Sequence, residues 1–299
     1  MRSFPPLPDL IASDSTDDVL RGHLWLLELI DGTGLRFRMD DSGLLRFGDP
    51  DATYADLEDA PLALRPAIRH VRARFDREAL RASVDDPAAV VFFGVATHRR
   101  RIDYDWQRLP PFLGTDVWTA SSGETGTPPT PAGGTDAPVG AFRPPDAAAA
   151  IFEGVGLDPV TAVERERNAR DFDPETYRIP DSAWYDGPAA GVVVRNKRGG
   201  RGRIRPDRLD ADSVADGDPE RLAEQYATRD RLERAVGSMQ RDGLPAAVGP
   251  LADRVVELVA REAPVRFDGR GSGPGVDPDR FRAAVLERAL PFVDDRLDT

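Results

Sequence analysis

The stretch that decides the fold is residues 23–39, which read HLWLLELIDGTGLRFRM. Its first part, His23 to Ile30, is almost wholly apolar, and such a run favours a buried strand. Asp31-Gly32 then breaks the run, and Leu35 to Met39 alternates between apolar and other residues, as a half-buried strand does. A second turn leads into a third short apolar run, Leu44 to Phe47. The spacing predicts three strands joined by tight turns in an antiparallel meander.

Beyond this stretch, helical and strand patterns follow one another and then give way to helices alone. The predicted elements up to residue 205 are a helical region at 62–83, strands at 88–96 and 112–120, a helix at 145–155, a strand within 158–166, a strand at 190–196, and a final strand after a basic turn at 197–205. Residues 219–236, 250–261 and 278–297 each have helical periodicity. We therefore expect an α+β protein. Its antiparallel-sheet domain spans residues 1–210 and carries a disordered insertion at about 121–140, and a small helical domain spans residues 211–299.

The charge of the chain is acidic, and its bases are almost all arginine. There are 52 Asp and Glu residues against 40 Lys and Arg residues, a formal net charge of −12, and Lys197 is the only lysine. This pattern is typical of a salt-adapted archaeal protein, although a high-GC genome would also favour arginine over lysine. General affinity for nucleic acid is not expected from such a chain, but a local arginine patch can still bind a phosphate.

Several classes of site and location are excluded or disfavoured by composition. The chain has no cysteine, which excludes disulfides and cysteine-ligated metals, and its three histidines are too scattered for a zinc site. No apolar run reaches the length of a membrane span, and no signal-peptide core is present. We expect a cytoplasmic protein without a membrane partner.

Four short motifs occur in a fixed order along the chain. They are ELIDGT at 28–33, LLRFG at 44–48, FFGVATHR at 92–99 and AGVVVR at 190–195, with Asp116-Val117-Trp118 after the third and Arg203-Ile204-Arg205 after the fourth. In order and spacing they resemble the motifs of ATP-dependent RNA ligases of the covalent nucleotidyltransferase superfamily. The resemblance covers about residues 23–205, and the helical tail is similar to the small C-terminal domain of the RNA ligase 2 type.

The resemblance implies a ligase-like nucleotidyltransferase core with ATP and Mg²⁺ as cofactors and RNA ends or a nucleotide as partner. In that family a neutral lysine amine attacks the α-phosphate of ATP and forms a lysyl-adenylate, while carboxylates hold the ribose and the metal. This chain has Leu29 at the position of the lysine, and Val95 and Ala190 at the positions of two carboxylates. Leucine has no nitrogen that could bond to phosphorus. We therefore assign no catalytic residue and no metal ligand.

The resemblance still implies a set of candidate residues for binding a nucleotide or a phosphate. They are Glu28, Asp31, Gly32, Arg46, Phe47, Arg195, Arg203 and Arg205. Asp31-Gly32 fits a hairpin turn as well as a retained nucleotide pocket, and the arginine patch fits a solvated turn as well as a phosphate site. His98 fits a structural residue at the end of its strand, and Lys197 fits a solvated turn lysine better than a relocated nucleophile.

Three functions remain open. The first is a catalytically silent relative that binds a nucleotide or RNA 5′-phosphate ends. The second is an active ATP-dependent RNA ligase with an unusual nucleophile, and the third is a structural or partner-binding protein with no nucleotide pocket. The joint loss of the nucleophile and of both carboxylates favours the first, because the missing nucleophile alone removes the covalent route.

Overall fold

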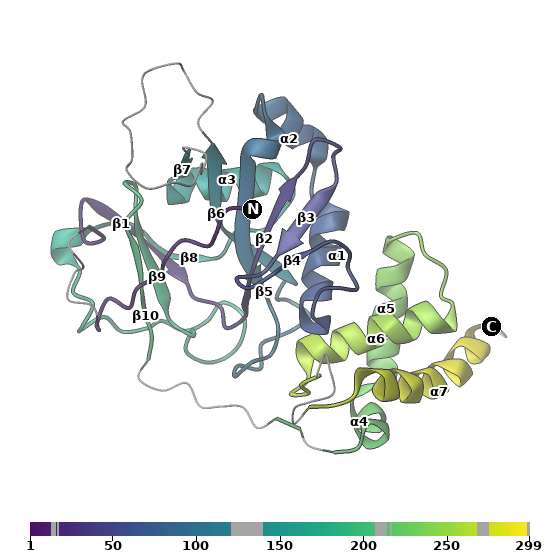
Figure 1. Cartoon of the computed structure of the whole chain (residues 1–299). Helices are drawn as coiled ribbons and strands as arrows, with labels where there is room; N and C mark the ends of the chain where they lie inside the picture. The colour runs from purple at the N-terminus through teal and green to yellow at the C-terminus, as the bar shows by residue number, and fades with distance from the viewer. Residues whose placement is uncertain are drawn as a thin grey trace.

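The computed structural model describes residues 1–12, 16, 18–120, 140–206, 214–215, 217–267 and 275–297. Two antiparallel sheets are followed along the chain by the helices α4 to α7, which confirms the expected α+β class (Figure 1). The predicted insertion lies outside the described residues as far as residue 139, and so does the predicted domain boundary at 210. None of the described helices combines the length and the apolarity that a membrane crossing requires.

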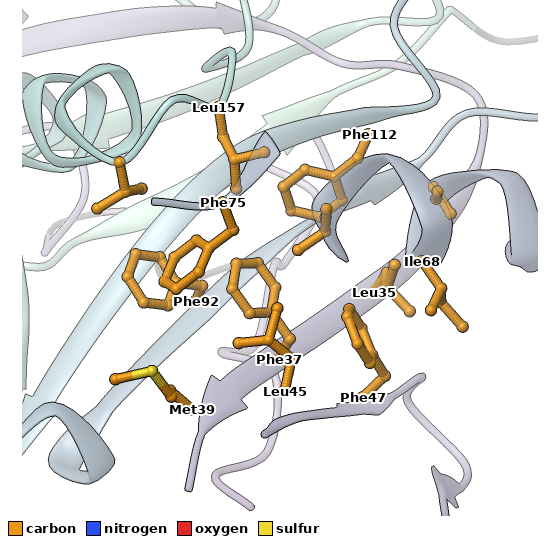
Figure 2. Close-up of a cluster of buried hydrophobic side chains, with 14 of the residues drawn as sticks. Leu35, Phe37, Met39, Leu45, Phe47, Ile68, Phe75, Phe92, Phe112 and Leu157 are labelled. Atoms are coloured by element: carbon orange, nitrogen blue, oxygen red, sulfur yellow. The ribbon is translucent and has the colours of Figure 1, made fainter. Parts of the chain in front are cut away.

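The larger sheet has six strands in the order β4-β3-β2-β5-β6-β7. They are β2 (Thr33–Met39), β3 (Leu45–Gly48), β4 (Thr53–Tyr54), β5 (Val90–Ala96), β6 (Phe112–Ala120) and β7 (Gly140–Phe142). One face packs against α1 (Arg65–Arg74), α2 (Arg77–Ser83) and α3 (Pro145–Gly154), with short 3-10 turns at η1 (Leu62–Leu64) and η2 (Pro87–Ala89). The core of this layer is aromatic: the Phe37 and Phe92 rings stack at 4.8 Å, and Phe75 meets both edge-on (Figure 2).

The smaller sheet has the order β10-β9-β1-β8 and corrects the predicted meander. Its strands are β1 (His23–Glu28), β8 (Ala162–Asn168), β9 (Val192–Asn196) and β10 (Arg201–Ile204), and η3 (Ala169–Asp171) follows β8. Strand β1 pairs with β8 and β9, whereas β2 pairs with β3 and β5 in the other sheet. The physical reason is burial on both faces of β1: Leu24 and Leu26 enter one apolar cluster, and Trp25 and Leu27 enter another. A strand of this kind needs a covering layer on each face of its sheet, which a meander with one solvated face does not provide.

The helical region has an apolar cluster of its own. Its helices are α4 (Pro219–Tyr226), α5 (Arg229–Arg241), α6 (Val248–Glu262) and α7 (Pro278–Leu297). The helix predicted at 219–236 is two helices, because Thr228 adopts an extended conformation and its hydroxyl accepts from Arg231 N at the start of α5. Two polar contacts join α6 to the preceding elements: Glu257 pairs with Arg69 of α1 at 2.8 Å, and Arg261 donates to the carbonyl of Thr97, just after β5, at 3.1 Å.

Candidate functional site

The inner faces of the two sheets oppose each other, and Arg195 and Arg203 project into the space between them. Cross-strand register puts Leu27, Val193 and Arg203 in one row of the smaller sheet, and Trp25, Arg195 and Arg201 in the next row. Directly paired residues project to the same side of an antiparallel sheet. In the larger sheet, Arg36, Phe93 and Asp116 form a comparable row. Arg201 reaches across to Asp116 at 2.6 Å, so these rows face one another. We call the region bounded by these rows the inter-sheet space.

Asp31-Gly32 is not a hairpin turn, because the strands on either side of it belong to different sheets. Asp31 is buried, and its carboxylate accepts from Arg101 N at 2.9 Å and pairs with the Arg101 guanidinium at 2.5 Å. This pairing raises the pKa of Arg101. Asp31 N also donates to the Tyr104 hydroxyl at 2.9 Å. A Cβ at Gly32 would lie 2.5 Å from the Ala96 carbonyl oxygen, so only glycine allows this crossing to pass so close to β5.

Apolar side chains surround the positions of the missing carboxylates. Val95 and Ala190 lie in one cluster with Trp25, Leu27 and Tyr104. Leu29 N donates to the Gly191 carbonyl at 3.0 Å, and the Leu29 side chain lies beside Gly191. These positions therefore offer hydrocarbon where the ligase motif has an amine and two carboxylates.

Glu28 is buried and bound to a neighbouring loop. Its carboxylate accepts from the Ser182 hydroxyl at 2.6 Å and from Ala183 N at 3.3 Å. Burial nevertheless raises the pKa of Glu28, and these two hydrogen bonds oppose the shift. Such a carboxyl group anchors the loop at 182–183, since its acceptor atoms are already used there.

The three candidate arginines differ in what they contact. Arg195 is almost fully buried and donates to the Thr115 and Arg143 carbonyls at 2.9 and 3.0 Å, and it pairs with Asp116 at 3.0 Å. Arg203 and Arg205 each have a buried Nε that has no hydrogen-bond partner among the described residues. Burial, followed by the proximity of Arg203, lowers the pKa of Arg205. Arg195 thus links the two sheets through its hydrogen bonds and its ion pair. Arg203 and Arg205 each keep an Nε–H group that donates to no described residue.

Two candidates lie away from these arginines. Phe47 is buried on the helix-covered face of the larger sheet, with its ring 5.7 Å from Phe37. Arg46 is exposed on β3 and pairs with Asp40 of the β2–β3 turn at 2.8 Å. The structure therefore places Asp31 close enough to Arg205 to influence its pKa. Glu28 pairs with Val192 and so projects to the side of β1 opposite the Arg203 row, and Phe47 lies on the helix-covered face of the larger sheet.

Lys197 and His98 both have defined partners. The Lys197 ammonium group lies 2.7 Å from Glu166 and 3.1 Å from Asp146, and these carboxylates raise the pKa of Lys197. His98 Nε2 lies 2.8 Å from the Thr33 hydroxyl. Burial lowers the pKa of His98 to about 4, so its ring is neutral at pH 7 and ties the end of β5 to the start of β2.

The protein groups near the site do not fit a Mg²⁺ ion held by side-chain carboxylates. Within the ranges that the structure describes, no three His, Asp or Glu residues converge as metal ligands. Asp31 is engaged by Arg101, Glu28 by Ser182 and Ala183, and Asp116 by Arg195 and Arg201. Mg²⁺ prefers several oxygen ligands, and these positions leave few of them free.

Sequence reasoning missed one contributor to the site, the lead-in segment Met1–Asp9. The Phe4 ring packs edge-on against Phe93 at 5.2 Å, and the Arg36 guanidinium lies 5.5 Å from the centre of the same ring. At the other end of the segment, Arg203 N donates to the Pro8 carbonyl at 2.9 Å. A lone aromatic residue in a Pro-rich stretch was the available signal, and it does not reveal which surface it will cover.

Comparisons with known proteins complete the description of the site. No family model and no curated protein matches the chain. A solved archaeal ATP-dependent RNA ligase (form 2) aligns with a TM-score of 0.44 and 14% identity over 98% of this chain and 64% of its own. The Naegleria gruberi RNA ligase with PPi aligns with a TM-score of 0.45 and 10% identity, over 68% of this chain and 57% of its own. A putative ATP-dependent DNA ligase from Aquifex aeolicus aligns with a TM-score of 0.41 and 12% identity, over 87% of this chain and 59% of its own. The chain spans less than two thirds of the length of each.

Proposed function

We propose that the chain is a ligase-type nucleotidyltransferase that does not adenylylate itself and that binds a nucleotide, or the 5′-phosphate end of an RNA, in the inter-sheet space. Its nucleotidyltransferase domain would span residues 1–210 and its helical domain residues 211–299. One observation carries the proposal: Arg203 and Arg205, where the ligase motif ends in two basic residues, each have a buried Nε without a partner among the described residues.

An anion would resolve the unfavourable arrangement of these arginines. A buried donor without an acceptor costs about 1–3 kcal/mol. The positive charges of Arg203 and Arg101 also oppose that of Arg205, whose pKa is lowered by burial and by both neighbours. A phosphate offers acceptors for two guanidinium groups at once and offsets their mutual repulsion.

The lysine that remains does not fit the role of a nucleophile. An attacking lysine needs a neutral amine, which burial or neighbouring cations provide by lowering its pKa. Lys197 has the opposite environment, because Glu166 and Asp146 raise its pKa and hold its proton. It also lies in the turn before β10, whereas Arg205 follows the other end of that strand. These features support a silent protein rather than a ligase with a relocated nucleophile.

The structure also offers an observation in favour of a protein with no nucleotide pocket. Aromatic side chains fill part of the space near Val95 and Ala190, with the Tyr104 and Tyr185 rings 5.5 Å apart. If these aromatic side chains always occupy the space, no nucleotide can enter it, and Arg203 and Arg205 would stabilise only the fold or a contact with another protein.

Labelling and binding measurements separate the three functions. The protein is incubated with ATP labelled at the α-phosphate and Mg²⁺ or Mn²⁺ in high salt, and we expect no labelled band. ATP or a 5′-phosphorylated RNA should raise the melting temperature of the parent protein. The rise should disappear in the double variant Arg203→Gln/Arg205→Gln and persist in Arg198→Gln, which removes an exposed arginine of the β9–β10 turn. A labelled band that is lost in Lys197→Ala would overturn the proposal, and the absence of both label and shift would favour the structural role.

A further inference from the structure

The Met1–Asp9 segment runs across the inter-sheet space and places one aromatic ring in it. Phe4 lies between the Phe93 ring, with which it forms a T-shaped pair at 5.2 Å between ring centres, and the guanidinium carbon of Arg36, 5.5 Å from its own ring centre. Arg36 also donates to the Arg2 carbonyl at 3.2 Å, and the Arg2 guanidinium lies 5.2 Å from the Trp118 ring. The chain therefore holds a flat ring between a cation and an aromatic ring, which is also a favourable setting for a nucleic-acid base.

Glycine at position 34 makes room for the ring. A Cβ there would lie 2.9 Å from two carbon atoms of Phe4. Gly34 and Arg36 project to the side of β2 opposite Leu35 and Phe37, which belong to the helix-covered core. The ring thus occupies a recess of the sheet surface whose floor is a residue without a side chain.

The segment leaves the polar groups around the recess incompletely satisfied. Arg36 Nε, Trp118 Nε1, Arg203 Nε and Arg205 Nε are buried, and none has a partner among the described residues. The segment supplies carbonyl oxygens, from Arg2 to Arg36 and from Pro8 to the Arg203 backbone, and the Asp9 carboxylate acts on Arg205 without hydrogen-bonding its Nε. Beside the ring, a cavity of about 730 Å³ is lined in part by Arg2, Phe4, Trp118 and Phe142, and a cavity of this size can hold a nucleotide.

The far end of the segment is fixed more firmly than the end that carries the ring. Leu10 is buried in the outer apolar cluster of the smaller sheet, and its N–H donates to the Arg203 carbonyl at 2.9 Å. Met1, Arg2 and Ser3 are exposed, and Phe4 is only partly buried. Release of Phe4 would therefore leave the segment attached at Leu10, so the ring would remain at high local concentration near its recess.

We propose that Phe4 occupies the subsite for the planar base of a nucleotide, so that the Met1–Asp9 segment and the nucleotide compete for the inter-sheet space. This inference rests on the function proposed above. It assigns the arginines to the phosphates and the recess above Gly34 to the base. The apparent affinity for a nucleotide is then reduced by the fraction of molecules in which Phe4 fills the recess.

Substitutions on the two sides of the contact test the competition in the full chain. Phe4→Ala empties the recess, and ATP should bind about tenfold more tightly than to the parent, because the competing ring is gone. Pyrophosphate has no base, and its affinity should change much less. Gly34→Ala should expel Phe4 but place a methyl group in the recess, so it should not gain affinity for ATP. Ile11→Ala changes an exposed residue of the same lead-in and serves as the control.

The outcomes distinguish this inference from the proposed function. If Phe4→Ala binds ATP no more tightly than the parent, while Arg205→Gln still weakens binding of ATP and pyrophosphate, the competition is refuted and the phosphate site stands. Equal gains for ATP and pyrophosphate in Phe4→Ala would refute the assignment of the recess to the base. If neither probe binds the parent or Phe4→Ala, the proposed function itself is wrong, and this inference falls with it. Circular dichroism of each variant shows whether the fold is retained.

Discussion

Replacing Arg261 with alanine should weaken the connection between α6 and the sheets. The Arg261 guanidinium is almost completely buried. It donates to the carbonyls of Thr97, Leu109 and Trp106 at 3.1, 2.6 and 3.3 Å, and to the Thr97 hydroxyl at 3.1 Å. Its ring neighbour is Trp106, whose centre lies 5.2 Å from the guanidinium carbon. One side chain thus holds acceptors from the loop that joins β5 and β6.

The expected loss in the free energy of unfolding is about 3 kcal/mol. A hydrogen bond to a charged group contributes about 1.5–3 kcal/mol, and removing one member of a buried polar network costs about 3–5 kcal/mol. Two considerations favour the lower end. Burial lowers the pKa of Arg261 to about 10, which shows that the buried charge is itself unfavourable. In addition, the Arg261 carbonyl keeps its hydrogen bond from Arg99 N at 2.7 Å in the variant.

Urea unfolding followed by circular dichroism and by tryptophan fluorescence measures this loss. If the helices and the sheets unfold together in the parent, the variant should have a lower midpoint, and the two probes should separate as the helical region uncouples. Arg266→Ala is the matched control, because Arg266 is an exposed arginine shortly after α6. A variant whose unfolding free energy lies within about 1 kcal/mol of the control would refute the argument, since leaving several buried carbonyl groups without their donor should cost more than that.

Two further predictions concern stability at the junction of the sheets. The pKa of His98 is about 4 in the folded chain and 6.5 ordinarily, so the unfolded chain takes up the proton first as pH falls. Protonation of His98 should therefore lower the free energy of unfolding by about 2 kcal/mol between pH 7 and pH 5, and His70, whose pKa burial also lowers to about 4, should add a similar decrease. His98→Asn should reduce that decrease in urea titrations at the two pH values, and an unchanged decrease would contradict the assignment. Gly32→Ala forces a methyl group to within 2.5 Å of the Ala96 carbonyl oxygen and should cost about 1–3 kcal/mol, seen as a fall in melting temperature. Gly154→Ala, with open space around its Cβ, should show no such fall, and equal melting temperatures for the two variants would disprove the clash.

The sequence predicted strands and helices better than it predicted their partners. The strand predicted at 112–120 has the same bounds as β6. The meander was wrong because periodicity reports which faces are buried, not which strand lies alongside. The apolar residues on both faces of β1 were a usable sign that its sheet is covered on both faces. The helix predicted at 219–236 ended early for a local reason, the cap formed by Thr228.

In the candidate site, too, the sequence identified residues but not their long-range partners. The order of the motifs drew attention to Leu29, Arg195 and Arg203 but could not separate the roles of the two arginines. Their difference arises from Asp116, which comes from a distant strand of the other sheet and engages Arg195. The contribution of Phe4 also depends on a long-range approach, which no spacing within the lead-in encodes.

The single lysine makes this protein unusually simple to modify chemically. Apart from an amine at a chain end, Lys197 has the chain's one aliphatic amine, and its side chain is about half exposed. An acylating dye should therefore attach at one internal position, and mildly alkaline buffer would help because the neighbouring carboxylates raise the pKa of Lys197. A carbodiimide should instead join Lys197 to Glu166 or Asp146, which lie 2.7 and 3.1 Å away. Peptide mapping of that amide bond would give a covalent record of which parts of the chain are neighbours at this end of the smaller sheet.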